Sequence, residues 1–265
     1  MLSRLSRLPR PAALAVCAVP VLALFAAAAF APLPFVLAQP GLTADVLGAR
    51  DGKNVITVTG APVRETRGQL LMTTIQAPGP SEKVDLGELV DSWFRTDRAV
   101  MPKEAIYPSG KTTEETEEHN LEEMAKSQST AAEAALGYLH KNPADVKVDL
   151  NLADVGGPSA GLLFSLGIVD KLDGDGSGGD LTGGRTVAGT GTIDPDGTVG
   201  AVGGVALKTQ AARRDGASVF LVPKAECSDA ASELPEGLQL VPVTTLSGAV
   251  DALRALNRGQ PAPSC

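Results

Sequence analysis

The stretch "DVGGPSAGLLFSLGIVD", residues 154–170, places a serine between a Gly-Gly-Pro turn and a strongly apolar run. The run from Ser159 to Leu172 has the length and composition of a buried helix. Pro158 would fix the chain where it enters this helix, and the two glycines ahead of it permit unusual backbone angles. Ser159 therefore stands at a predicted helix N-terminus, where a serine serves either as an N-cap or as a nucleophile.

Strands and helices alternate around this stretch. "VKVDLNL" (146–152) alternates apolar and polar residues, which predicts a half-buried strand. Further strands are predicted at "RTVAGTGTI", "SVFLVP" and "LQLVPV", between helices at about 205–214 and at "LSGAVDALRAL". Upstream, "NVITVTG" and "GQLLMTTIQAP" predict strands, and a helix is expected from about Thr113 to Leu139. The pattern indicates an α/β (α+β) fold.

The N-terminal region has a different composition. Arg4, Arg7 and Arg10 precede a segment without charge from Pro11 to Ala38. This segment exceeds the apolar core of about 7–15 residues that a cleaved signal needs, so we expect a transmembrane signal anchor. The small residues of "FAAAAFA" leave cleavage as the alternative.

The positive-inside rule puts the arginines in the cytoplasm and the rest of the chain outside it. We therefore expect a single-pass cell-membrane protein in three parts. These are an n-region and anchor (1–39), a β-rich part with a helix (40–142), and an α/β domain (143–265).

The net charge and the absence of certain motifs argue against several functions. The 265 residues carry a net charge of −8, without the basic footprint of a nucleic-acid-binding protein. No Cys/His cluster suits zinc, and no GxxxxGK[ST] loop could hold ATP. "DGDGSGGDLTGG", from Asp173, begins like a calcium loop but has Gly184 where the bidentate Glu is required. We expect no cofactor and no metal.

Of the three cysteines, Cys17 lies in the apolar segment, which leaves Cys227 and Cys265 as a pair. Outside the cytoplasm such a pair would oxidise, so a disulfide is predicted, with two free thiols as the alternative.

A nucleophilic serine needs a base, and the chain has only two histidines. His119 lies on a charged face and His140 at a helix end, so both are expected in solvent. A lysine can serve as base if burial lowers its pKa. On a wheel of about 100° per residue, Lys208 is the only charged residue on the apolar arc of the helix 205–214. Lys208 either extends its charge past small alanines into solvent or is a buried base.

Four motifs carry a resemblance to a known family. "GGPSAG", "AGTGTIDPDGTVGAVGG", "GGVALKTQAARRDGA" and "FLVP" resemble, in unbroken order between residues 146 and 243, the proteolytic domain of Lon-type Ser-Lys proteases. The resemblance implies a serine endopeptidase in which Ser159 is the nucleophile, Lys208 the general base and Thr190 a hydrogen-bond partner of the lysine amine. It also implies supporting roles for Gly157, Pro158 and Ala160.

The sequence departs from the family in three ways. It shows no ATPase motif, Gly156 replaces an Asp common in cytosolic members, and only "HKNPAD" separates Leu139 from Val146. The order of elements resembles membrane-anchored, extracytoplasmic Lon-like proteins of bacteria, whose PDZ domain has no room in that gap. This resemblance implies ATP-independent cleavage of exposed segments of protein or peptide substrates, and a homo-oligomeric ring. The alternative is a non-catalytic scaffold or binding protein of the cell envelope.

Overall fold

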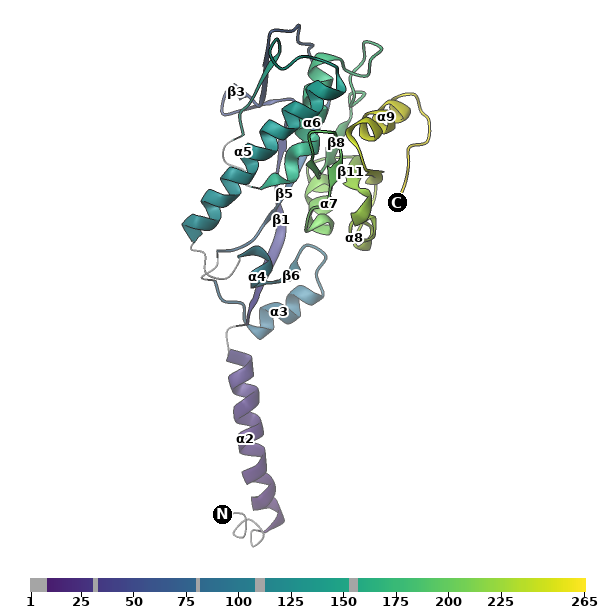
Figure 1. The fold of residues 1–265 in the computed structure, drawn as a ribbon. Helices are drawn as coiled ribbons and strands as arrows, with labels where there is room; N and C mark the ends of the chain where they lie inside the picture. Colours follow the sequence, from purple (N-terminus) through teal and green to yellow (C-terminus); the bar gives the residue numbers. More distant parts are fainter. Residues whose placement is uncertain (1–8, 31–32, 80–81, 108–112, 153–156) are drawn as a thin grey trace. The chain divides into compact units, whose positions relative to one another are not determined.

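A computed structural model describes residues 9–30, 33–79, 82–107, 113–152 and 157–265 (Figure 1). Arg4, Arg7 and Gly156, which the sequence analysis singled out, lie outside these ranges. The chain forms two compact units, one from residues 1–38 and 77–109, the other from 39–76 and 110–265. This division differs from the boundaries predicted after residues 39 and 142, because a strand and a long helix of the middle segment pack into the larger unit.

The larger unit is built on a mostly parallel sheet. Its strands, in spatial order, are β12 (Gln239–Val243), β11 (Val219–Pro223), β8 (Thr186–Gly189), β5 (Gln69–Gln76) and the part of β1 (Phe35–Asp45) from Gln39 onward. The first four strands are parallel, and β1 is antiparallel to β5. β11 is buried along its whole length, as expected for a parallel strand covered on both faces.

Helices cover both faces of this sheet. Val219 and Leu221 of β11 belong to one hydrophobic core, and the alternating Phe220 and Val222 belong to another, so the two cores lie on opposite faces. The first core contains α6 (Gly161–Leu172) and α9 (Leu246–Asn257), with α5 (Thr113–Tyr138) packed against both. The second contains α7 (Val205–Arg214) and α8 (Cys227–Ser232). The predicted α/β fold is confirmed.

Short elements complete this unit. Short strands pair antiparallel in three places: β2 (Ala49–Arg50) with β3 (Lys53–Asn54), β4 (Ile56–Thr59) with β7 (Lys147–Leu150), and β9 (Thr192–Ile193) with β10 (Val199–Gly200). One-turn 3₁₀ helices are η1 (Pro158–Ala160) and η2 (Lys224–Glu226). The helix predicted to begin at Ser159 therefore begins as η1 and continues as α6, whose residues 161–170 are all buried.

The smaller unit contains α2 (Arg10–Phe30), α3 (Leu86–Trp93), α4 (Lys103–Ile106) and β6 (Ala99–Pro102), which pairs with residues 35–38 of β1. The N-cap of α3 is Asp85, whose side chain forms a capping box with Glu88. Among the residues that the structure describes, no helix combines the length and the apolar character needed to cross a membrane. The predicted transmembrane anchor is therefore unsupported by the structure.

Candidate active site

Ser159 lies in η1, directly ahead of α6. Gly157 adopts a φ of +95°, a left-handed conformation that favours glycine, and Pro158 occupies the first turn. The N-cap of α6 is Ala160, and no side chain caps either helix. The N-cap alternative for Ser159 is therefore wrong. Ser159 is partly exposed.

The backbone around Ser159 is held from two sides. The Ser159 carbonyl accepts hydrogen bonds from the Gly191 N–H (2.9 Å) and from Thr190 Oγ1 (3.2 Å), both just after β8. The Pro158 carbonyl accepts a hydrogen bond from Ser127 Oγ of α5 (3.0 Å). The serine is thus fixed between the long helix and the end of a central strand.

Lys208 reaches the same place from α7. Its side chain is buried, with 3% of the residue exposed, and its Nζ donates a hydrogen bond to Thr190 Oγ1 (3.1 Å). The alternative that Lys208 extends into solvent is therefore wrong. Thr190, also fully buried, links the lysine amine to the Ser159 backbone. The structure brings the three predicted residues together.

The electrostatic environment of Lys208 suits a base. Burial lowers the pKa of its ammonium from 10.5 to about 8, and the negative charge of Glu226 partly opposes this decrease. At pH 7 about one Lys208 in ten would therefore be neutral, against about one in 3,000 for a lysine in solvent. A neutral amine is the form that accepts a proton.

The second glycine of the Gly-Gly pair ahead of α7 has a steric reason to be glycine, whereas a Cβ at Gly203 would meet nothing within 4 Å. Gly204, the residue before the first turn, adopts a φ of +67°, and a Cβ there would lie 2.9 Å from Ile75 Cγ2. A larger residue there would press on the Ile75 side chain of β5 and would also be strained by the positive φ. Gly204 thus allows the start of α7 to approach β5 closely.

Two carboxylates near Lys208 were not identified from the sequence. Glu226 Oε1 accepts a hydrogen bond from the Val202 N–H (3.2 Å), and Asp229 Oδ2 accepts one from the Val205 N–H (3.1 Å). Both carboxylates come from the segment after β11, "KAECSD", in which they are the only acidic residues. Their spacing of three residues, directly after a buried strand, was the available signal.

Cys227 lies between these two carboxylates and forms a disulfide with Cys265, with a Cα–Cα distance of 5.4 Å. The bridge ties the end of the chain to α8, next to the segment that contacts the start of α7. Cys17 is a free, exposed thiol.

Sequence comparison identifies the domain that holds this site. Residues 116–254 match the Lon protease (S16) C-terminal proteolytic domain. The chain belongs to the Lon protease family. It is 28% identical over 166 residues to a Lon protease of Chloroflexus aggregans (strain MD-66 / DSM 9485), a match that covers 51% of this chain and 19% of that protein. The chain thus spans about a fifth of the length of this relative. Ser159, Thr190 and Lys208 all fall inside the matched Lon domain.

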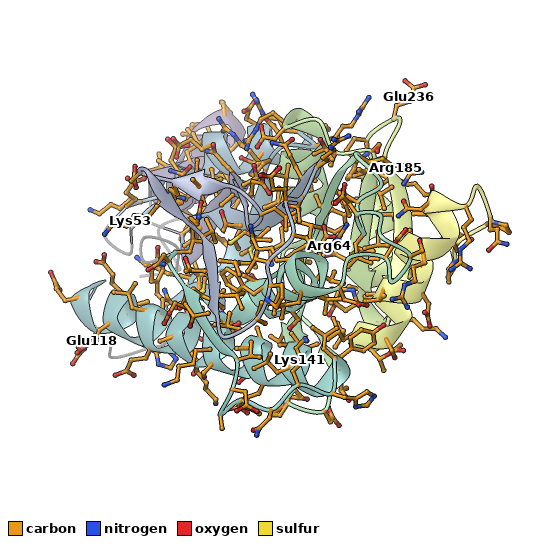
Figure 2. The ribbon with its side chains drawn as sticks, turned by 90° about the horizontal axis from the view of Figure 1, so that it is seen from above. Lys53, Arg64, Glu118, Lys141, Arg185 and Glu236 are labelled. Atoms are coloured by element: carbon orange, nitrogen blue, oxygen red, sulfur yellow. A yellow bond between two sulfur atoms is a disulfide. The ribbon has the colours of Figure 1, made fainter. Side chains whose placement is uncertain are left out.

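The acidic loop that resembles the start of a calcium loop, residues 173–184, is contacted by an arginine from another segment of the chain. The Arg64 guanidinium (Figure 2) donates hydrogen bonds to the carbonyls of Gly178 (2.8 Å) and Asp170 (3.2 Å) and pairs with the Asp180 carboxylate at 3.7 Å. Among the described residues, no cluster of His, Cys, Asp or Glu could hold a metal ion. The arginine thus supplies the positive charge that the loop carbonyls and carboxylates attract.

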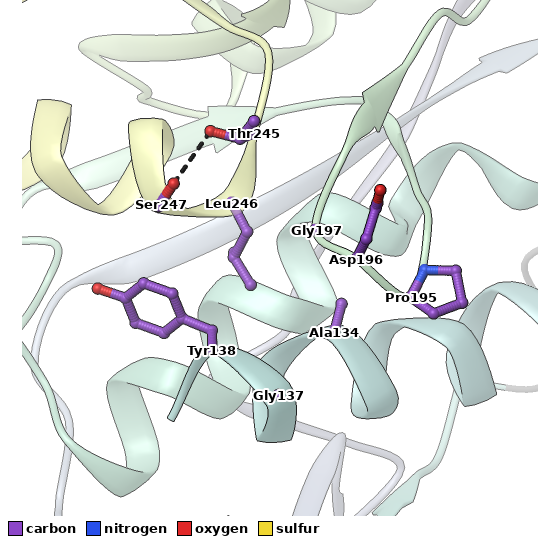
Figure 3. Close-up of a pocket in the computed structure, with 9 residues that line it drawn as sticks. All are labelled: Ala134, Gly137, Tyr138, Pro195, Asp196, Gly197, Thr245, Leu246 and Ser247. Carbon is purple, nitrogen blue, oxygen red and sulfur yellow. Dashed lines mark hydrogen bonds between the residues drawn. The ribbon is translucent and has the colours of Figure 1, made fainter. Parts of the chain in front are cut away.

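A cavity of the Lon domain lies apart from Ser159 and Lys208. It has a volume of about 360 Å³ and opens between α5, the turn after β9 and the start of α9 (Figure 3). Tyr138, Asp196 and Leu246 are among its lining residues, whereas Ser159, Thr190 and Lys208 are not. His119 and His140 are both exposed.

Proposed function

We propose that the Lon domain of this chain is an ATP-independent serine endopeptidase with Ser159 as nucleophile and Lys208 as general base. The observation that carries the proposal is the buried Lys208 amine, which is hydrogen-bonded to Thr190 beside the Ser159 backbone. Because both histidines are exposed, Lys208 is the candidate base among the described residues. Membership of a protease family supports proteins or peptides as substrates.

In the proposed reaction, Ser159 Oγ attacks the carbonyl carbon of a peptide bond while neutral Lys208 accepts the hydroxyl proton. Lys208 then delivers this proton to the leaving amine as the C–N bond breaks, which leaves an acyl-enzyme. A water molecule attacks the ester, its proton passes to Lys208, and the C–O bond to Ser159 breaks. The proton returns to Ser159, so the dyad is regenerated.

Backbone groups beside Ser159 are candidates for the oxyanion site. The first N–H groups of a helix have no partner within it and carry a partial positive charge. The start of η1 and α6, which includes Ala160, supplies such groups next to the nucleophile. Donors of this kind stabilise the negative charge that develops on the carbonyl oxygen.

We also propose that the chain is tethered to the cell membrane with its Lon domain outside the cytoplasm. The support comes from the uncharged segment 11–38 and from the Cys227–Cys265 disulfide, which fits an oxidising compartment. N-terminal sequencing of the protein in the membrane fraction should recover the uncleaved start. A mature start near Pro32 would instead indicate secretion.

The proposed substrates are exposed segments of extracytoplasmic proteins, and the family resemblance supports a homo-oligomeric ring. Light scattering of the purified full chain should give a mass that is a multiple of the 27.1 kDa chain. A mass equal to one chain would contradict the ring.

The peptidase proposal is tested by incubating the full chain with an unfolded protein mixture, without ATP, and identifying new termini by mass spectrometry. New termini are expected with the wild-type protein and not with Ser159→Ala or Lys208→Met. The same termini in all three samples would indicate a contaminating protease. The absence of new termini in every sample would favour the alternative, a non-catalytic scaffold of the cell envelope.

A further inference from the structure

The position of Lys208 depends on a segment outside its own helix. Gly204, at the N-cap of α7, has no side chain to cap the helix. The Asp229 carboxylate, from α8, accepts the hydrogen bond from the Val205 N–H instead, and Glu226 Oε1 holds the Val202 N–H three residues earlier. Two carboxylates thus fix the backbone that leads to the lysine.

Glu226 has a feature that Asp229 lacks. Its second oxygen, Oε2, is buried and has no hydrogen-bond partner among the described residues. A buried carboxylate oxygen without a partner destabilises a protein unless another interaction compensates. The nearby positive charge that could compensate is the Lys208 ammonium, whose pKa the Glu226 charge raises.

The other elements packed against α7 supply no competing charge. β5, β8 and β11 contain no ionisable side chains along their lengths. The arginines of α7 lie in its last turn, away from Lys208. In η2 and α8, Lys224 and Asp229 are exposed. Glu226 is therefore the charged group of these elements whose negative charge acts on the buried amine.

We propose that Glu226 is a positioning residue of the peptidase site, which fixes the start of α7 through one carboxylate oxygen and presents an unpaired negative charge to Lys208 through the other. This inference rests on the proposed function of Lys208 as the base. Burial alone would lower the basicity of the amine further. Glu226 thus limits that decrease and keeps Lys208 basic enough to accept the Ser159 proton.

The first variant is Glu226→Gln in the full chain, because its amide oxygen still accepts the Val202 hydrogen bond while the charge is lost. The midpoint of the rise of kcat/KM with pH should move to lower pH, by on the order of 0.5–1 pH unit. Well below the midpoint, the neutral fraction of Lys208 should rise roughly three- to tenfold. Glu226→Ala, which also loses the hydrogen bond, should in addition lower the plateau of kcat/KM.

Asp229→Asn is the matched control, since it removes one negative charge from the same segment and keeps an acceptor for the Val205 N–H. Its pH midpoint should equal that of the wild-type protein. An unchanged or higher midpoint in Glu226→Gln, or an equal decrease in both variants, would overturn the proposal.

A second readout separates this inference from the proposed function. The Lys208 ¹³Cε signal, identified by its absence in Lys208→Met, can be titrated by NMR in the inactive Ser159→Ala chain. The added Glu226→Gln change should lower the titration midpoint. If the wild-type chain cleaves nothing, the peptidase proposal fails, and this titration still decides whether Glu226 controls Lys208.

Discussion

Lys208→Met should stabilise the fold while it abolishes peptidase activity. Burial lowers the pKa of Lys208 from 10.5 to about 8 on folding. This difference destabilises the folded state by about 3 kcal/mol at pH 7, because 1.36 kcal/mol corresponds to each factor of ten in proton affinity. Met has a similar unbranched shape and no charge to bury. The hydrogen bond to Thr190 is lost, which costs about 1 kcal/mol, so a net gain of about 2 kcal/mol is expected.

The gain should depend on pH in a defined direction. The unfolded lysine binds its proton more tightly than the folded one, so the wild-type chain gains stability as pH rises between the two pKa values. Below pH 8 the lysine is protonated in both states and the full penalty applies. Between about pH 8 and 10.5 the penalty disappears, and the advantage of the Lys208→Met chain should fall by about 3 kcal/mol.

Urea unfolding of both full chains at pH 7, 8, 9 and 10 measures this difference, provided that their m-values agree. Lys126→Met, a change of an exposed lysine on α5, is the control and should stay within about 0.5 kcal/mol of the wild-type protein at each pH. The reasoning would be refuted if the Lys208→Met chain were less stable than the wild-type chain at pH 7. It would also be refuted if the difference in their free energies of unfolding were the same at every pH.

Three further predictions concern activity, the acidic loop and the cysteines. With a fluorogenic peptide, kcat/KM should rise with pH through a midpoint near 8, the pKa of buried Lys208. At pH 7 the neutral fraction of such a lysine is about 300-fold higher than that of a lysine of pKa 10.5. A midpoint near 10.5 would exclude a buried base. Arg64→Met should destabilise the chain by about 3 kcal/mol at pH 7, because it leaves the buried Asp170 carboxylate without its guanidinium partner. The loss should be smaller at pH 5, since burial raises the pKa of Asp170 to about 6; equal losses in thermal unfolding at both pH values would contradict this account. Thiol titration of the denatured, unreduced chain should find one reactive thiol, Cys17, and three after reduction; three without reduction would argue against the bridge.

The sequence was informative where the structure depends on local periodicity. The wheel of α7 placed Lys208 on the apolar arc, and the structure buries it, because one side of a helix must face the sheet. The apolar run after Ser159 likewise predicted α6, whose residues 161–170 are all buried. The roles of these residues in catalysis remain predictions.

Contacts between segments that are distant in the sequence could not be predicted from local periodicity. Glu226 meets Val202 only because α7 and β11 lie between them and the chain returns to the start of the helix. Arg64 reaches the carbonyl of Asp170 from 106 positions away. Such partners follow from topology, and no local pattern of apolar residues specifies them.

The choice of neighbours explains how a lysine can be both held and kept reactive. A carboxylate hydrogen-bonded to the amine would stabilise the ammonium and raise its pKa again. Thr190 is neutral, and because its own proton goes to the Ser159 carbonyl, its oxygen accepts a hydrogen bond from either NH₃⁺ or NH₂. The hydroxyl thus orients the amine without favouring one protonation state strongly. The Glu226 charge acts without a hydrogen bond to the amine, so it moderates the pKa instead of fixing the proton. In the proposed mechanism, a neutral partner in contact and a charge without a hydrogen bond to the amine together give a base that is positioned and still able to accept the serine proton.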